Sequence, residues 1–325
     1  MESAAVKKRF GFANYFNWMG ILWIHLGVGI ALYRDHLTWK LGALALLSYC
    51  IRMFGITGAY HRYFAHRTFK TSRPFQFLLG FIGTAATQKG PLWWAAGHRV
   101  HHKYSDQEKD LHSPVQRGFF YSHMGWWLGG EHDETRLDLI QDFARYPEIR
   151  FLERFHYLGI AATMLLGWWY GGFDGFLWIY VVSTCALLHS VFLVNSLAHV
   201  SGSRRYETGD ESRNNWLIAF LTMGEGWHNN HHHYQSSCRN GFMWWEIDIT
   251  YYIIKAFSFV GLVWDVREPP ARVYEEAKLG LGGVKESTRV TKKKQQAARP
   301  QQDSEPDAQL LGGELAGSEA PADAE

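Results

Sequence analysis

The chain has 325 residues, of which 47% are hydrophobic and 20% charged, so it is long enough for one large domain and can bury a core. Its three cysteines form no C-x-x-C pair, which argues against a disulfide framework and against a cysteine-based zinc or iron–sulfur site. A net charge of +2 gives no reason to expect nucleic-acid binding, whereas 17 histidines and 15 tryptophans are unusually many.

Four segments are apolar, nearly free of charged residues and long enough to cross the ~30 Å hydrocarbon layer of a membrane. The second carries one charge, Arg52, which would have to snorkel or pair with a carboxylate. The segment 74–97 is too polar in its second half to span, and we expect surface or partly dipping helices there. The sequence therefore predicts an all-α integral membrane protein with four transmembrane helices in two hairpins, at residues 11–33, 41–60, 155–172 and 175–203.

The distribution of basic residues predicts the orientation. The two turns between paired spans, 34–40 and 171–174, are short, and they contain only Arg34 and Lys40 among the basic residues. The positive-inside rule then places both termini and the remaining loops in the cytoplasm, where they form a helical cap. We expect a membrane-bound domain over residues 1–268 and a polar, mostly disordered tail over 269–325, from its composition.

Nine histidines occur in short motifs on the predicted cytoplasmic side. One motif is H-x4-H and two are H-x2-H-H. The one remaining histidine lies four residues after an asparagine. On a helix, positions i, i+3 and i+4 share one face, so each H-x2-H-H presents three imidazoles together. The motifs are His61 and His66; His98, His101 and His102; Asn195 and His199; and His228, His231 and His232.

Nine nitrogen donors in one place point to transition metals. One zinc takes four ligands, and magnesium or calcium would require oxygen ligands. Nine imidazoles suit two metals with open positions, and imidazole is a good ligand for iron. A single histidine near a membrane surface is more often a hydrogen-bonded interfacial residue, which is our interpretation of His25, His36, His123, His132, His156 and His189.

The motifs and their spacing resemble those of the membrane-bound acyl desaturases of the Δ9 (stearoyl) type, including bacterial and cyanobacterial members. The resemblance covers residues 10–268, and it is carried by GITGAYHRYFAHR at 55–67, GPLWWAAGHRVHHKYSD at 90–106, RGFFYSHMGW at 117–126, NSLAH at 195–199 and GEGWHNNHH at 224–232. It implies a centre of two Fe²⁺ ions held by the nine histidines, with Asn195 holding a metal-bound water. It also implies that O2 and two electrons from a separate ferredoxin-like or haem protein with its reductase introduce a cis double bond at Δ9.

Three carboxylates near the motifs, Asp106, Asp110 and Glu225, are candidates to orient the imidazoles, although each could also be an ordinary solvated charge. An apolar tunnel for the substrate would draw on Trp93, Trp94, Trp126, Trp127 and Trp227.

Two departures from the family pattern matter. Residues 110–112 read Asp-Leu-His where the family commonly has Asp-Pro-His, and His112 is kept out of the ligand set. The residues after Trp126 lack the basic side chains that hold CoA phosphates in the animal enzymes, so both acyl-CoA and an acyl group on a membrane lipid stay possible.

Two other functions use similar residues. A membrane di-iron hydroxylase or alkane monooxygenase would need the same metals and differs in its product. A histidine-rich metal transporter would place its ligands near the bilayer midplane, whereas these clusters sit at one end of the spans.

Overall fold

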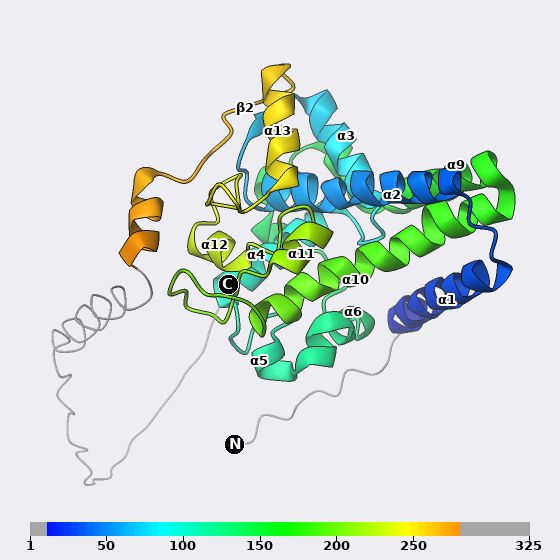
Figure 1. Cartoon of the computed structure of the whole chain (residues 1–325), viewed down its shortest axis with the longest axis horizontal. Coiled ribbons are helices and arrows are strands. Elements are labelled where there is room, and N and C mark those ends of the chain that lie inside the picture. Colours follow the sequence, from blue (N-terminus) through cyan, green and yellow to red (C-terminus); the bar gives the residue numbers. More distant parts are fainter. Residues whose placement is uncertain (1–11, 280–325) are drawn as a thin grey trace, which may run out of the picture. The chain divides into compact units, whose positions relative to one another are not determined.

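The computed structural model describes residues 12–279, and this part of the chain is mostly helical (Figure 1). Long helices form one region, and short helices and loops form a cap at one end of them. The elements are α1 (Phe12–Arg34), α2 (Trp39–Phe54), η1 (Gly55–Ala65), β1 (Lys70–Thr71), α3 (Arg73–Thr84), α4 (Pro91–Tyr104), α5 (Pro114–Arg117), η2 (Tyr121–Gly125), α6 (Trp126–Leu128), η3 (Leu137–Leu139), α7 (Gln141–Ala144), α8 (Pro147–Arg154), α9 (Tyr157–Gly175), η4 (Phe176–Val182), α10 (Ser183–Asn195), η5 (Leu197–His199), α11 (Trp216–Leu221), α12 (His228–His233), α13 (Ile249–Phe259) and β2 (Val263–Trp264).

Two helical stretches, Trp39–Ala65 and Tyr157–His199, are long and apolar enough to cross a membrane. The second is 43 residues long because it contains a reversal at Gly171 and Gly172. Gly172 has φ +57° and ψ −138°, a conformation that is open to glycine and strained for other residues. Past this turn the chain runs back along α9, and the two passes come so close that a Cβ on Gly167 would lie 2.9 Å from the carbonyl oxygen of Gly175.

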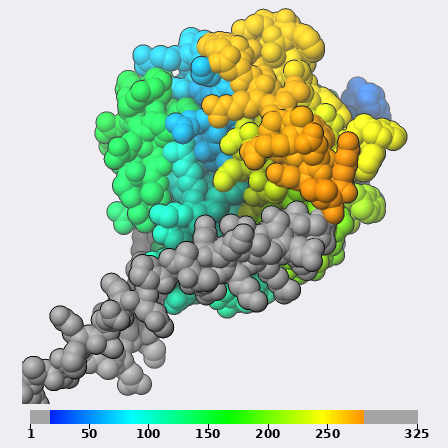
Figure 2. Space-filling view, turned by 90° about the vertical axis from the view of Figure 1, so that its left-hand side faces the viewer, coloured from blue at the N-terminus to red at the C-terminus, as the bar shows by residue number. Residues whose placement is uncertain are grey.

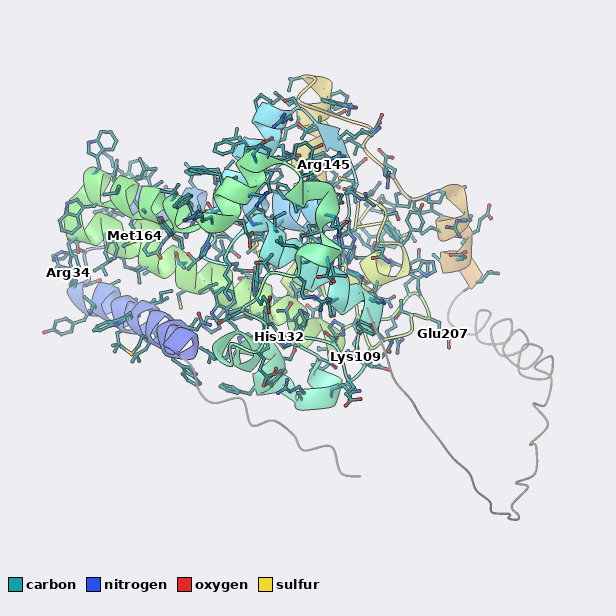
Figure 3. The ribbon with its side chains drawn as sticks, turned by 180° about the vertical axis from the view of Figure 1, so that it is seen from behind. Arg34, Lys109, His132, Arg145, Met164 and Glu207 are labelled. Atoms are coloured by element: carbon teal, nitrogen blue, oxygen red, sulfur yellow. The ribbon has the colours of Figure 1, made fainter. Side chains whose placement is uncertain are left out.

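An ion-pair cluster joins the ends of the two helical hairpins. Nε of Arg34, the last residue of α1, donates to Oδ1 of Asp174 at 2.7 Å, and Nδ1 of His36 lies 2.9 Å from Oδ2 of the same carboxylate. Figure 3 shows Arg34 at the opposite end of the long helices from Lys109 and Glu207. The two short turns of the sequence therefore lie together, away from the cap.

Arg52 is 2% exposed inside the bundle. Among residues 12–279 its guanidinium neither snorkels nor pairs with a carboxylate, so both alternatives raised by the sequence are wrong. Its Nη1 donates to Oγ1 of Thr184 at 2.6 Å, its Nη2 to Oγ of Ser183 at 2.5 Å, and its Nε to the carbonyl oxygen of Ser48 at 3.2 Å. Neutral acceptors on α2 and α10 thus meet the hydrogen-bonding requirement of this buried cation.

The largest buried cluster surrounds η1, a π-helical continuation of α2 in which all residues are buried. The hydroxyl of Tyr63 donates to Oε1 of Gln76 on α3 at 2.8 Å, and that of Tyr60 donates to the carbonyl oxygen of Lys89 at 3.0 Å. The segment 74–97, expected to form surface or partly dipping helices, packs one face of α3 closely against η1, where Leu79 is 1% exposed, while Leu78 is 46% exposed. It places α4 beside the end of the second predicted span.

The C-terminal part of the described chain returns to the cap. Strand β2 pairs antiparallel with β1, and residues 271–279 form a helix. Figure 2 shows these yellow and orange segments beside blue and cyan segments from the first half of the chain. Val273 is fully buried and its carbonyl oxygen accepts from the hydroxyl of Tyr206 at 3.0 Å, so the packed region continues past residue 268, where we expected it to end. The rest of the predicted disordered tail lies outside the described residues.

Candidate metal centre

The nine motif histidines form two groups in the cap. In each group, one ligand atom per residue lies within 4.8 Å of the corresponding atoms of all the others. The two groups adjoin, since the ring centroids of His102 and His232 are 4.5 Å apart. The five-histidine group contains His61, His66, His98, His102 and His231, and the four-histidine group contains His101, His199, His228 and His232.

Within both groups the Nε2 atoms face inward. In the five-histidine group, Nε2 of His98 lies 2.9 Å from Nε2 of both His66 and His102. In the four-histidine group, Nε2 of His199 lies 3.0 Å from Nε2 of His228. Convergence of one nitrogen per ring on a common point is the arrangement that a coordinated metal requires.

Each H-x2-H-H motif contributes to both groups. The sequence predicted that each motif presents three imidazoles on one helix face, and on α4 His98 and His102 turn to the five-histidine group while His101 belongs to the other. On α12, His231 joins the five-histidine group, whereas His228 and His232 join the four-histidine group. The two helices therefore bridge the two groups.

The H-x4-H motif reaches one group because η1 is a π-helix. Residues five apart lie about 140° apart around an α-helix, at ~100° per residue. In a π-helix the hydrogen bonds run from i to i+5, and the amide of His66 donates to the carbonyl oxygen of His61 at 3.1 Å. This geometry brings both rings to the same side, with centroids 4.8 Å apart.

Carboxylates contact the outward-facing Nδ1 atoms of four of these histidines. Three of the carboxylates were candidates from the sequence: Oδ2 of Asp106 is 2.8 Å from Nδ1 of His199, Oδ1 of Asp110 is 2.9 Å from that of His101, and Oε2 of Glu225 is 2.6 Å from that of His61. A proton on Nδ1 leaves Nε2 with its lone pair directed into the group.

The fourth carboxylate, Asp210, was missed by sequence reasoning. Its Oδ2 lies 2.6 Å from Nδ1 of His232, and its Oδ1 accepts from the amide and hydroxyl of Ser212. Asp210 lies in a polar loop 22 residues before His232, and nothing in its sequence neighbourhood distinguishes it from solvated acids. A search limited to carboxylates near the motifs could not find it.

Glu153 fixes the start of α4. Its Oε2 accepts from the amides of Leu92 and Trp93 at 2.8 and 3.2 Å, so a carboxylate caps amides that have no partner within the helix. Gly90 precedes this turn, and a Cβ there would lie 2.2 Å from Oε2 of Glu153. The contact sets the position of the helix that carries three of the nine histidines.

The two asparagines between the histidines of α12 anchor that helix. Oδ1 of Asn229 accepts from the amides of Arg205 and Tyr206 at 2.8 Å. Nδ2 of Asn230 donates to Oε2 of Glu246 at 2.8 Å. Both asparagines are fully buried, so they hold the back of the helix while its histidines face the two groups.

Electrostatics favours the metal-binding form of the rings. Burial, reinforced by the neighbouring imidazoles, lowers the pKa of five histidines well below that of a free imidazole: His66, His98, His102, His228 and His231. Burial also lowers the pKa of His232 to about 4, despite the attraction of Asp210. These rings are neutral at pH 7, and a neutral imidazole is the form that binds metal.

Burial also opposes ionisation of the surrounding carboxylates, but the favourable interactions with their hydrogen-bond and charge partners are stronger than this effect. The hydrogen bonds from His199, from the amide of Glu211 and from the hydroxyl of Ser113 bring the pKa of Asp106 below its usual value. The charges of His61 and Arg62 do the same for Glu225, whose Oε1 accepts from Nη2 of Arg62 at 3.0 Å. The carboxylates therefore stay ionised; Oδ2 of Asp106 accepts from Nδ1 of His199, and Oε2 of Glu225 lies beside Nδ1 of His61.

Two adjoining cavities reach the groups. The larger has a volume of about 700 Å³, and the smaller, of about 40 Å³, is lined by both His101 and His228. They share four lining residues: Trp94, His98, Val191 and Asn195. Figure 3 shows Lys109 and His132, which line the larger cavity, at the cap end of the molecule.

The predicted tunnel tryptophans divide between this cavity and other environments. Trp93, Trp94 and Trp126 line the larger cavity. Trp127 packs against a cluster with Phe192, and Nε1 of Trp227 donates to the carbonyl oxygen of Ile247 at 2.8 Å. Beside the cavity, Nδ1 of His112 lies 4.0 Å from Asp110, and this ring belongs to neither histidine group.

The chain matches the family model described as "Fatty acid desaturase" over residues 37–259. It is 39% identical over 236 residues to "Acyl-CoA 5-desaturase AL21" of Anemone leveillei, an alignment that covers 71% of this chain and 73% of that protein. It is 37% identical over 266 residues to "sn-1 stearoyl-lipid 9-desaturase" of Anabaena variabilis, covering 78% and 94% of the two chains. It is also 37% identical over 240 residues to "Delta-9 acyl-lipid desaturase 2" of Arabidopsis thaliana, covering 72% and 77%.

The matched region contains the helices that carry all nine histidines. With this extent of similarity, the chain belongs to the fatty acid desaturase family.

Proposed function

We propose that this protein is an integral-membrane desaturase that introduces a cis double bond at Δ9 of a saturated fatty acyl chain. The observation that carries the proposal is the convergence of nine Nε2-bearing rings in two adjoining groups beside a cavity. The family membership and the Δ9 relatives support it.

The all-nitrogen donor set fits two Fe²⁺ ions, one in each group. Asn195 lines both cavities, and in the smaller one it lies together with His101 and His228 of the four-histidine group, where it would hold a metal-bound water as a fifth ligand. When bound, the two irons supply the redox chemistry that uses O2 and two electrons to remove two hydrogens from adjacent methylenes.

The protein's own task is to position and shield. Asp106, Asp110, Asp210 and Glu225 retain the Nδ1 protons, so that the rings keep one tautomer and one orientation. The tryptophan-lined cavity holds the acyl chain against the groups and excludes water, so that one C–C bond is presented.

The acyl chain arrives on CoA or on a membrane lipid, and relatives of both kinds support this choice of substrates. Electrons come from a separate ferredoxin-like or haem protein with its reductase. The substrate carrier and the electron donor both approach the cap, where Lys103 and Lys109 line the larger cavity.

We further propose four transmembrane spans in two hairpins, with the cap and both termini in the cytoplasm. The contact of Arg34 with Asp174 supports one common outer end for the hairpins. Large apolar side chains project from the outer faces of α1, α2 and α9, where lipid would cover them: Trp23 is 63% exposed, Leu46 62% and Trp169 83%.

Expression of the full chain in a host that lacks its own desaturase tests this function. We expect monounsaturated fatty acids with a Δ9 double bond, and none from His98→Ala or His231→Ala variants that still insert in the membrane. His156→Ala is the matched control, because Nδ1 of His156 contacts the carbonyl oxygen of Glu153, outside both groups.

The mass of the product separates the alternatives. Loss of two hydrogens supports desaturation, whereas gain of one oxygen identifies a hydroxylase. Metal-dependent transport in vesicles without any product from acyl-CoA or acyl-lipid would refute the proposal.

A further inference from the structure

A third cluster of metal-ligating side chains lies between α1 and α10, outside the nine-histidine centre. His25 comes from α1, and Cys185 and His189 come from α10, where their i, i+4 spacing places them on one face. One ligand atom from each lies within 4.8 Å of those of the other two. The proposed desaturase chemistry uses none of these residues.

The two imidazoles of this cluster are oriented as in the nine-histidine centre. Their Nε2 atoms face each other at 3.0 Å, with the rings at 85°. Nδ1 of His25 donates to the carbonyl oxygen of Ile21 at 2.8 Å, which requires the proton on Nδ1 and leaves the lone pair on Nε2. His25 is therefore already in the tautomer that binds a metal through Nε2.

A chain of polar contacts positions the second ring. Nδ1 of His189 lies 3.0 Å from Nε2 of His123 on η2, and Nδ1 of His123 lies 3.0 Å from Oγ of Ser196. Partners of this kind, on the side of a ring that faces away from the ligand point, orient metal-binding histidines. His123 and His189, interpreted from the sequence as separate interfacial residues, are thus parts of one assembly.

We propose that His25, Cys185 and His189 bind one Zn²⁺ ion. A thiolate and two imidazoles form a donor set that suits zinc and does not suit magnesium or calcium. On binding, the Cys185 thiol loses its proton to water that enters with the ion, and the S–Zn bond forms without any change of oxidation state. Three protein ligands leave a fourth position for water.

The sequence argued against a cysteine-based zinc site because no cysteines are paired along the chain. The tertiary structure supplies the missing ligand from a helix 160 residues earlier. Because the ligands come from two helices, the ion would hold α1 against α10 near the small apolar cluster of Ile21, Leu188 and Phe192. His25 is exposed on α1, within the first proposed span.

Co²⁺ titration of the full-length protein in detergent tests this site, because a cobalt–thiolate bond gives a charge-transfer absorption in the near ultraviolet. The nine-histidine centre contains no cysteine and cannot produce this band. We expect the band in the unmodified protein, its displacement by Zn²⁺, and its loss in Cys185→Ser. Cys50→Ser is the matched control, since Cys50 is a half-buried thiol on α2, and it should keep the band.

His25→Ala should weaken the cobalt affinity at least tenfold. Because this side chain is exposed, its removal should not disturb folding, and a lower affinity would report the loss of a ligand. Metal analysis should find about one zinc per chain fewer in His25→Ala and Cys185→Ser, with the iron content unchanged. The absence of a thiolate band in the unmodified protein, or an equal band in Cys185→Ser, would overturn the proposal. Neither result bears on the desaturase function, which is tested by its product.

Discussion

Oδ2 of Asp210 lies 2.6 Å from Nδ1 of His232, a residue 22 positions later in the chain. The contact places an ionised carboxylate behind one ring of the four-histidine group, as Asp106 is placed behind His199. The tautomer of a metal-binding ring depends on such a partner.

Replacement of this carboxylate by the neutral amide in Asp210→Asn should lower iron affinity or activity by about 10–100-fold, because an amide holds the Nδ1 proton less firmly. Iron content and product formation measure the effect. Glu211→Gln is the control from the same loop, since its side chain is 43% exposed and pairs with Arg204. Equal activity in the two variants would show that Asp210 has no orienting role.

The unequal sizes of the two groups predict different metal losses. His199→Ala leaves three imidazoles in the four-histidine group, whereas His66→Ala leaves four in the other. We expect His199→Ala to retain about one iron per chain and His66→Ala to retain more, because four nitrogen ligands still suffice for a metal. Iron analysis of the purified variants checks this, and equal losses would contradict the two-group arrangement.

The hydroxyl partners of Arg52 predict different losses of stability for two substitutions. Thr184→Val removes the 2.6 Å partner of Nη1 and leaves a buried cation with one contact fewer, which should cost about 1–3 kcal/mol. Arg52→Met removes the charge itself and should change the free energy of unfolding by less, about 1 kcal/mol or under. Ser183 keeps a partner in that variant, because its Oγ donates to the carbonyl oxygen of Ile179 at 2.6 Å.

Thermal unfolding in detergent, followed by circular dichroism, compares the two variants. A larger loss of stability in Arg52→Met than in Thr184→Val would show that the charge itself is required.

The buried histidines predict that the metal-free protein loses stability in mild acid. Burial holds the pKa of His98, His228 and His231 well below the ~6.5 of an unfolded histidine, so the unfolded chain binds more protons as the pH falls through 6.5. The free energy of unfolding should then fall by about 1.4 kcal/mol per pH unit for each proton taken up.

Carboxylates do not explain a loss of stability between pH 8 and 5. The lowered pKa of Asp106 contributes stability that is lost only as the pH falls below ~4. The melting temperature of metal-depleted protein between pH 8 and 5 is the measurement, with iron-loaded protein as the control, because bound metal should shift the loss to lower pH. A melting temperature independent of pH in this range would be incompatible with neutral buried rings.

The sequence determined the long apolar helices, because runs without charged residues are readable from composition alone. The predicted topology also placed the histidine motifs at one end of these helices, and the structure brings their rings together. The family relationship is likewise carried by local motifs, and the comparisons confirm it.

Only the tertiary structure decided how the ligands divide. Spacing places His101 and His102 on neighbouring parts of one helix, but the position of α12 assigns their rings to different groups. The same is true of contacts between segments far apart in the chain, such as Asp210 with His232 or His25 with Cys185. A residue's own neighbours set its backbone geometry, whereas its partners across the fold depend on packing of the whole chain.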